Sequence, residues 1–369
     1  MPLKIPFYRY NYLYKIFGKK IIKIIDKVAC GGRYIMQKEL SEFEKKFANF
    51  TGSKYCVGVS NATDGLQMLL MASGIKKDDE VLVSMHTMIA TASAVHFAGA
   101  KPVPVGISEE DYLIDPKKIV KKITKNTKGI IVTQLNGRVA KMYEIKKIAT
   151  KYNLMLFEDS AQALGAKYKN VHAGNFGIGG CFSFYPAKIL GCLGDGGAVI
   201  MNSKKIYKKI LALRDHGRVN NDVKVWGLNA RLDNIEAAVL DYLLSKVPSF
   251  IEKRRYFASI YNNELKKIKE IKLPPLNFKN SDNFDVFQNY EINATRSNEL
   301  CEYLKLKKIG TLRQWGGKSL NNFKKLKMSN VDSQSDKIFK NLVMLPMNNS
   351  ITNREVKYIA QKIKEFYGY

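Results

Sequence analysis

The chain has 369 residues, of which 46% are hydrophobic and 25% charged, and its 61 Lys and Arg residues outnumber 33 Asp and Glu residues to give a formal net charge of +28. This composition is typical of a globular protein and excludes intrinsic disorder as the dominant state. The length predicts two or three domains, and the charge leaves open a protein that binds nucleic acid or an anionic membrane surface.

Five cysteines are scattered along the chain, and no two of them form a Cys-x-x-Cys pair. The chain has only four histidines. No set of cysteines and histidines shows the usual spacing of zinc ligands, so we predict no metal site. We expect reduced cysteines and a cytoplasmic protein. The sequence predicts no signal peptide and contains no run of the roughly 20 apolar residues that would span a bilayer, so we expect no membrane insertion.

The first predicted element is an N-terminal arm, residues 1–37, that is rich in tyrosine and lysine. Isoleucines recur at helical spacing between Ile21 and Ile25, with lysines around them. This pattern predicts a helix that packs on the protein and keeps its lysines in solvent. A helix that lies on a membrane surface fits the same pattern.

From Glu39 to about Leu240, short apolar runs alternate with helical patterns. Such alternation predicts an α/β fold in which helices cover a mostly parallel sheet of seven strands, within a large domain over residues 1–245 that includes the arm. Ligands of such folds bind at the carboxyl ends of the strands. The predicted strands are Tyr55–Ser60, Val81–Ser84, Pro102–Val105, Gly129–Gln134, Leu154–Glu158, Cys181–Tyr185 and Ala198–Met201, and the predicted helices include Asp64–Ala72, Ile89–Phe97, Tyr143–Tyr152 and Lys204–Leu213.

Residues 246–369 form the second predicted domain, which is smaller and of the α+β type. A long helical pattern at Phe250–Leu265 leads into it, and Val286–Asn293 reads as a strand. Further helices are predicted at Ser297–Leu306 and at Asn353–Phe366, the latter after a Thr352 that can cap it.

Two residues that follow predicted strands are candidates for chemistry. Asp159 comes directly after a buried strand, and Lys188 follows the next strand along the chain, close to the glycine-rich turn Gly194–Gly197. A lysine with restricted access to water has a lowered pKa and can act as a nucleophile. A lysine and a carboxylate that meet at a sheet edge suit pyridoxal phosphate (PLP), because the lysine forms a Schiff base and the carboxylate keeps the pyridine nitrogen protonated, so that the ring can accept electrons. A structural ion pair is the alternative.

A phosphate site is the second candidate feature. Residues Ser60–Gly65 join a strand to a helix, so backbone N–H groups and the Thr63 hydroxyl can receive a phosphate at the helix N-terminus. Ser183 offers another hydroxyl near the same edge. The alternative for Asn61 and Thr63 is a plain helix cap.

Taken together, Asp159 with Gln162, Ser183 with Lys188, and the segments Gly194–Gly197, Arg214–Gly217 and Gly227–Asp233 resemble the PLP-dependent sugar aminotransferases of the DegT/DnrJ/StrS family. The resemblance implies a fold-type-I PLP transferase of the aspartate aminotransferase type. Lys188 matches the lysine that forms the Schiff base and moves the proton, Asp159 the carboxylate on the pyridine nitrogen, and Gln162 the side chain near the ring hydroxyl.

The resemblance also implies the rest of the site. Ala62, Thr63 and Ser183 match the phosphate cup, and Asn229 matches a residue that reaches the phosphate from the partner subunit, which implies a homodimer. Met88 stands where many members place a planar side chain over the ring, and the segment Arg313–Lys318 differs from better-known members at the border of the sugar site. The substrate-binding candidates are Tyr185, Arg231, Trp315 and Lys318.

The implied function is the conversion of a keto group on a nucleotide-linked sugar to an amine, with L-glutamate as the expected donor, in the biosynthesis of surface polysaccharides or related amino sugars. One alternative is a PLP-dependent sugar dehydratase of the same fold, but such enzymes carry a histidine where this chain has Lys188. Another is a non-enzymatic basic protein that binds polyanions, although the chain has no recognised nucleic-acid motif. The sugar, its nucleotide and the choice of C3 or C4 stay open.

Overall fold

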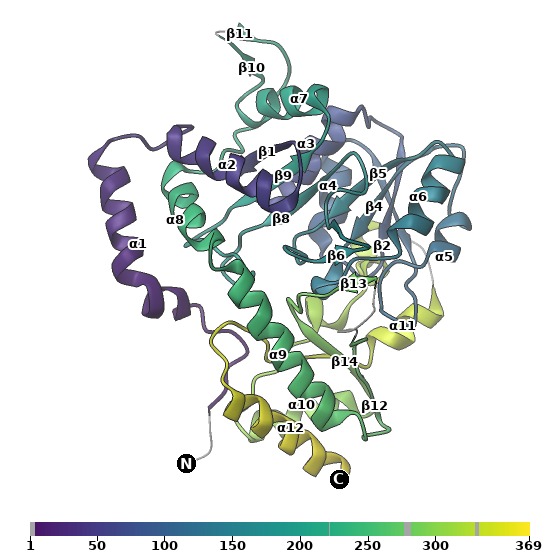
Figure 1. Ribbon diagram of the computed structural model, residues 1–369. Helices are drawn as coiled ribbons and strands as arrows, with labels where there is room; N and C mark the ends of the chain where they lie inside the picture. The colour runs from purple at the N-terminus through teal and green to yellow at the C-terminus, as the bar shows by residue number, and fades with distance from the viewer. Residues whose placement is uncertain (1–3, 221, 277–281, 329–331) are drawn as a thin grey trace.

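The computed structural model describes residues 4–220, 222–276, 282–328 and 332–369. A large α/β body occupies one half of the molecule, and a smaller α+β part lies beneath it (Figure 1). Helix α9 (Val247–Leu265) runs from one to the other, and the C-terminus lies at the far end of the small part. The division of the chain at residue 245 stays a prediction, and in the structure that residue lies between α8 (Asn234–Leu244) and α9.

A seven-stranded sheet forms the centre of the large body and confirms the predicted fold. All strands run parallel except β9, which is antiparallel to both of its neighbours. In spatial order the strands are β1 (Tyr55–Val59), β9 (Gly197–Met201), β8 (Gly179–Ser183), β5 (Met155–Asp159), β4 (Thr127–Thr133), β2 (Glu80–Ser84) and β3 (Lys101–Val105).

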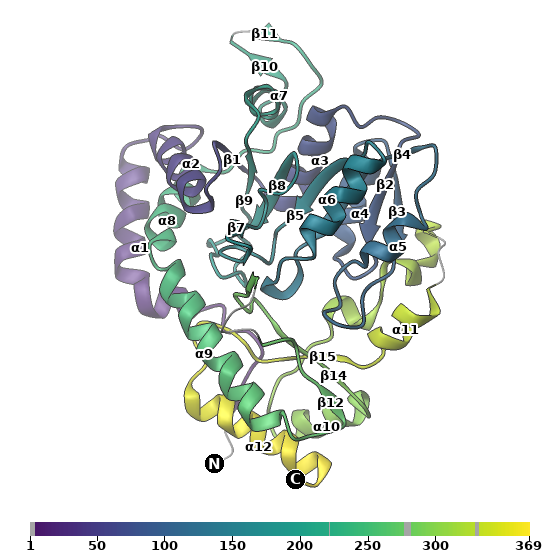
Figure 2. The ribbon, with the colours of Figure 1, turned by 45° about the vertical axis from the view of Figure 1, so that its right-hand side comes forward.

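Side chains of the sheet alternate between two hydrophobic cores, as the period of two along a strand requires. In β4, for example, Ile130 and Val132 belong to one core and Ile131 to the other. Helices α2 (Lys38–Thr51), α6 (Met142–Lys151) and α8 cover the first face, and α3 (Ala62–Ser73), α4 (Ile89–Phe97) and α7 (Lys204–Arg214) cover the second. These layers hold the carboxyl ends of the parallel strands at one edge, which faces the small part (Figure 2).

The small part has its own core around a three-stranded antiparallel sheet, β12 (Ile271–Lys272), β14 (Tyr290–Ala294) and β15 (Leu342–Leu345). Its helices are α9, α10 (Ser297–Leu306), α11 (Ser333–Phe339) and α12 (Asn353–Tyr367). The Thr352 side chain accepts a hydrogen bond from Glu355 N–H, so the predicted cap of α12 is confirmed.

The strand predicted at Val286–Asn293 is wrong in its first half. Phe287 has a φ angle of 49°, which breaks the extended backbone, so β14 begins only at Tyr290. The residues before it form a loop that carries Gln288 and Asn289 toward the large body.

The N-terminal arm contains the predicted helix, α1 (Tyr12–Cys30), which lies along α8 with Ile21 buried. Ahead of α1, Ile5 N–H donates to Lys308 O and Gly310 N–H donates to Ile5 O, at 2.9 and 2.8 Å. The arm thus packs on both parts of the chain. Among the described residues, no helix is long and apolar enough to cross a membrane.

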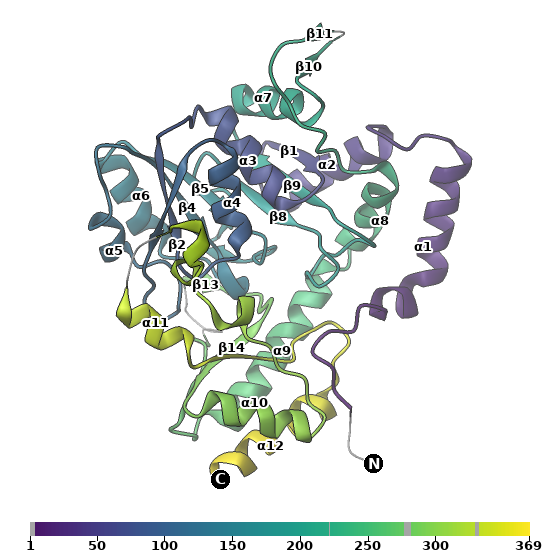
Figure 3. The ribbon, with the colours of Figure 1, turned by 180° about the vertical axis from the view of Figure 1, so that it is seen from behind.

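The remaining elements are short. A hairpin, β10 (Arg218–Val219) and β11 (Asp222–Val223), projects from the large body in all views, including the one from behind (Figure 3). The others are α5 (Pro116–Val120), β6 (Lys167–Tyr168), β7 (Val171–His172), β13 (Asn283–Phe284) and the 3₁₀ turns η1 (Leu135–Gly137), η2 (Gln314–Gly317), η3 (Leu320–Asn322) and η4 (Lys324–Leu326).

Candidate active site

A cavity of about 450 Å³ opens at the carboxyl edge of the sheet, between the large body and the small part. It is lined by nine of the residues predicted from sequence: Ala62, Thr63, Met88, Asp159, Gln162, Ser183, Tyr185, Lys188 and Trp315. These residues come from several strand ends and loops, and the fold brings them together as the parallel sheet predicts.

Asp159, the last residue of β5, is buried at the bottom of this site. Its Oδ2 accepts a hydrogen bond of 2.6 Å from Thr91 Oγ1, and its Oδ1 accepts one of 3.1 Å from Ala161 N–H. Burial raises the pKa of the carboxyl group, while these two donors and the charge of Lys188 lower it. The carboxylate is therefore held in one orientation and has lone pairs left for a further donor.

A row of threonine hydroxyls leads to Asp159. Thr133 Oγ1 lies 2.8 Å from Thr87 Oγ1, which lies 2.7 Å from Thr91 Oγ1. Because an ionised carboxylate only accepts, Thr91 donates to Asp159, Thr87 donates to Thr91, and Thr133 donates to Thr87. Hydrogen bonds in such a row polarise one another and favour the ionised form of the carboxyl group. Sequence reasoning missed this row, because isolated threonines form no motif.

Lys188 follows β8 in a turn that is fixed from the small part. The side chain of Gln288 accepts a hydrogen bond from Ile189 N–H at 2.9 Å and donates one to Ala187 O at 3.0 Å. One amide therefore binds the backbone of both residues that flank the lysine. Burial lowers the pKa of Lys188 to about 8, although the charge of Asp159 opposes the shift. At pH 7 such a pKa leaves roughly one amine in ten uncharged, and this uncharged form can act as a nucleophile.

The N-terminus of α3 forms another wall. Asn61 caps the helix by accepting a hydrogen bond from Asp64 N–H, while Ala62 and Thr63 line the cavity. The first N–H groups of a helix have no partner within it and suit a phosphate. Strand β9 approaches this turn so closely that a Cβ on Gly197 would lie 2.6 Å from the Asn61 carbonyl carbon and 2.8 Å from Ala62 N.

These groups fit PLP. The helix terminus, with the hydroxyls of Thr63 and Ser183, would hold the phosphate, and Asp159 would hold the ring nitrogen in its protonated form. Lys188 supplies an amine of lowered pKa in the same cavity. Met88, which is 52% exposed, offers a thioether that packs on aromatic faces.

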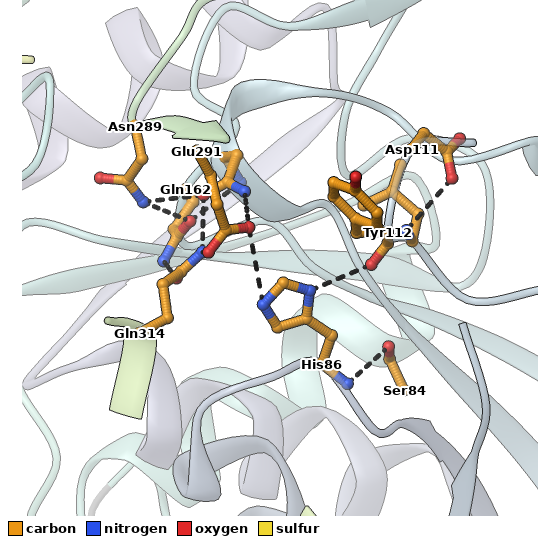
Figure 4. Close-up of polar contacts among 10 residues, drawn as sticks. Ser84, His86, Asp111, Tyr112, Gln162, Asn289, Glu291 and Gln314 are labelled. Carbon is orange, nitrogen blue, oxygen red and sulfur yellow. Dashed lines mark hydrogen bonds and ion pairs between the residues drawn. The ribbon is translucent and has the colours of Figure 1, made fainter. Parts of the chain in front are cut away.

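A buried polar cluster borders the cavity on the side of the small part (Figure 4). It joins Gln162 to Asn289 and Gln314, which also line the cavity, and continues to Asn136, Glu291 and His86. The ring of Trp315 packs edge-on against His86, with centroids 5.5 Å apart. Of the cluster only Gln162 was predicted, because the others occupy loops and strands of both parts without a recognisable spacing.

The tyrosine-rich start of the arm also reaches the site. Tyr8 and Tyr10 line the cavity, and the hydroxyl groups of Tyr10 and Tyr185 lie 3.5 Å apart. The arm is anchored beside them, since Arg9 pairs with Glu355 and Asn348 donates to Phe7 O. The tyrosines of the arm are evident in the sequence, but the sequence did not predict that they line the cavity.

Three predicted residues do not line this cavity. The backbone of Asn229 pairs with that of Asp215, and Arg231 lies 3.0 Å from the Asp215 carboxylate. Lys318 is exposed. The role predicted for Asn229 belongs to a partner subunit's site, so it stays a prediction, as do the substrate roles of Arg231 and Lys318.

Comparison with known proteins identifies the relatives of this chain. Residues 15–364 match the model of the DegT/DnrJ/EryC1/StrS aminotransferase family. The dTDP-3-amino-3,6-dideoxy-alpha-D-galactopyranose transaminase of Aneurinibacillus thermoaerophilus is 34% identical over 370 residues, covering 99% of this chain and 100% of the relative. The UDP-2-acetamido-2-deoxy-3-oxo-D-glucuronate aminotransferase of Pseudomonas aeruginosa is 39% identical over 251 residues, or 68% of this chain and 70% of the relative.

The fold is shared as well. The structure of S. venezuelae DesV in complex with a ketimine intermediate superposes with a TM-score of 0.94, at 30% sequence identity over 99% of both chains. The likeness therefore includes the arm, the large body and the small part.

Proposed function

The chain belongs to the DegT/DnrJ/EryC1/StrS aminotransferase family, and from this membership we propose that it transfers an amino group to the keto carbon of a nucleotide-linked sugar. Aminotransferases of this family use PLP. The observation that carries the proposal is the meeting of Lys188, with its lowered pKa, and the buried carboxylate of Asp159 in one cavity.

PLP, when bound, supplies an aldehyde and a ring that accepts electrons. The chain's own residues do the rest. Lys188 Nζ, whose lowered pKa makes its uncharged form more accessible, takes a proton from the substrate carbon and returns it. Asp159, steadied by Thr91 and Ala161, holds a proton on the ring nitrogen. Charge that develops in the transition state is then stabilised by groups that are already in position and need not rearrange.

We propose L-glutamate as the amino donor and the cytoplasm as the location, where reduced thiols are the rule; all five cysteines are free. A homodimer is also part of the proposal. Trp226, beside the projecting hairpin, is 95% exposed, and Val223 on the hairpin is 61% exposed. Apolar side chains so exposed favour burial against another surface, and Asn229 follows directly on the same segment.

The dehydratase alternative is not favoured, because Lys188 is present where such enzymes carry a histidine. The polyanion-binding alternative gives no reason for a lysine of lowered pKa beside a buried carboxylate.

Absorption spectroscopy tests the proposal. The protein loaded with PLP is expected to show a visible band that shifts when L-glutamate is added, because the donor half of the reaction changes the cofactor. Lys188→Ala is expected to abolish the shift at catalytic rates, whereas Lys208→Ala, an exposed lysine on α7, leaves it intact. A Lys188→Ala protein with wild-type turnover contradicts the proposal.

A further inference from the structure

In the buried cluster of Figure 4, the donor and the acceptor of each hydrogen bond can be assigned. The assignment starts from the groups that can only donate or only accept. At one end, Glu291 is 2% exposed and its carboxylate accepts hydrogen bonds from two amides. Asn136 Nδ2 donates to Glu291 Oε2 at 2.8 Å, and Gln314 Nε2 donates to Oε1 at 3.1 Å. The carboxylate therefore fixes which end of each amide is nitrogen.

The same direction continues from Asn136. Its Oδ1 accepts from Gln314 Nε2 at 2.8 Å and from Asn289 Nδ2 at 3.0 Å. Its backbone N–H, which can only donate, lies 2.9 Å from Gln162 Oε1. Gln162 Oε1 also accepts from Asn289 Nδ2, at 3.1 Å. Every amide of the cluster thus has one orientation.

Asn289 is left with an unused acceptor. Both hydrogens of its Nδ2 are taken, by Asn136 and by Gln162, and its Oδ1 has no partner among the residues that the structure describes. The side chain is only 6% exposed and lines the cavity, and Figure 4 shows its oxygen turned away from the cluster. An acceptor that faces the cavity and has no partner in the protein is free to accept a hydrogen bond from a donor group of a ligand.

We propose that Asn289 Oδ1 accepts a hydrogen bond from a hydroxyl group of the sugar substrate, and that Glu291 is the positioning residue that keeps this acceptor turned to the cavity. The inference rests on the proposed function and narrows its substrate class. The preferred keto sugar carries a hydroxyl that reaches Asn289, and its deoxy analogue at that position is a poorer substrate. The carboxylates of the amino donor only accept hydrogen bonds, so they cannot donate to Asn289 Oδ1.

Paired substrates test the proposal. The measured quantity is the ratio of kcat/KM for a keto sugar nucleotide and for its deoxy analogue, taken for each hydroxyl position in turn. The wild-type protein is expected to prefer one hydroxylated sugar by about tenfold, in line with one neutral hydrogen bond. Asn289→Leu keeps the size, removes the acceptor and is expected to bring that ratio close to one.

Because the ratio is taken within one protein, a general loss of activity cancels. Asn263→Leu, an exposed asparagine on α9, serves as the matched control and keeps the wild-type ratio. Glu291→Gln, whose amide can donate as well as accept, is expected to lower the ratio, and Glu291→Asp to restore part of it.

Two results distinguish a failure of this inference from a failure of the proposed function. If the wild-type protein aminates keto sugar nucleotides but Asn289→Leu and Glu291→Gln keep its preference, Asn289 does not select the substrate. If the wild-type protein aminates none of them, the proposed function itself fails.

Discussion

At the residue scale, the reactive groups are held in place by hydrogen bonds and close contacts from neighbouring residues. Thr91 orients Asp159, and Gln288 forms hydrogen bonds with the backbone on both sides of Lys188. Gly197 and Asn61 shape the turn at the N-terminus of α3. Thr91 and Gln288 belong to no motif found in the sequence, yet the chemistry depends on them as well.

Thr91→Val tests the support of Asp159. The substitution keeps the shape and removes the donor, which is worth about 1.5–3 kcal/mol when the acceptor is charged. Because this hydrogen bond lowers the pKa of Asp159, its loss raises that pKa, and the acidic limb of the pH profile of kcat is expected to move to higher pH. Thr91→Ser keeps a hydroxyl and serves as the control. An unchanged acidic limb in Thr91→Val would show that the row of hydroxyls is irrelevant to the carboxylate.

The pKa of Lys188 predicts how the apoprotein loads its cofactor. With a pKa of about 8, the uncharged fraction of the amine rises with pH and levels off above that value, so the rate of PLP loading should do the same. Asp159 raises this pKa, so Asp159→Asn is expected to move the midpoint to lower pH. Stopped-flow absorption at a series of pH values measures both. A midpoint near the ordinary lysine value of about 10.4 would contradict the environment described for Lys188.

The sequence identified Asp159 and Lys188 because each follows a buried strand and sits in a recognisable segment. It did not identify Asn289 or Glu291. They lie more than one hundred residues from Gln162 along the chain, and no local pattern shows that β14 and the loop before it bring them into one cluster with it. Polar residues that meet only in the folded chain need the tertiary structure to be found.

At the element scale, the site depends on how closely strand β9 approaches the start of α3. The alternation of apolar runs was enough to predict all seven strands of the sheet to within two residues at every end, because most of their residues are buried. It failed at Phe287, where a positive φ angle ends the extended backbone and a loop carries Gln288 to Lys188. Apolar residues alone do not reveal such a break.

Gly197→Ala tests the approach of β9 to α3. The added methyl group would meet the backbone of Asn61 and Ala62, which cannot turn aside as a side chain can. We expect a loss of about 1–3 kcal/mol in the free energy of unfolding and weaker PLP binding, measured by urea denaturation and absorption titration. In Gly194→Ala, from the same turn, the nearest atom to the new Cβ is Glu236 Oε1 at 4.0 Å. Equal stability and PLP affinity in both variants would refute the tight contact.

At the scale of the whole molecule, the net charge of +28 first suggested a polyanion as the partner. The site instead uses few charged groups. Lys188 is the lysine in its lining, and helix α3 offers N–H groups rather than ammonium groups for a phosphate. Most other lysines lie on the surface, and nothing in the structure explains why they are so numerous.

The arm, the large body and the small part all contribute to one cavity. Tyr8 and Tyr10 come from the arm, Lys188 from the large body and Trp315 from the small part. We therefore expect the cavity to be complete only when all three parts are folded together. The similarity to relatives likewise extends over nearly the full length of the chain.

The amination of a nucleotide-linked keto sugar tests the central claim most directly. The protein is incubated with PLP, L-glutamate and each member of a panel of keto sugar nucleotides, and the products are analysed by mass spectrometry. We predict that at least one sugar is converted to its amino sugar, with one 2-oxoglutarate formed per amine, and that Lys188→Ala makes neither product. Amination of none of the sugars by the wild-type protein, or undiminished amination by Lys188→Ala, would contradict the account.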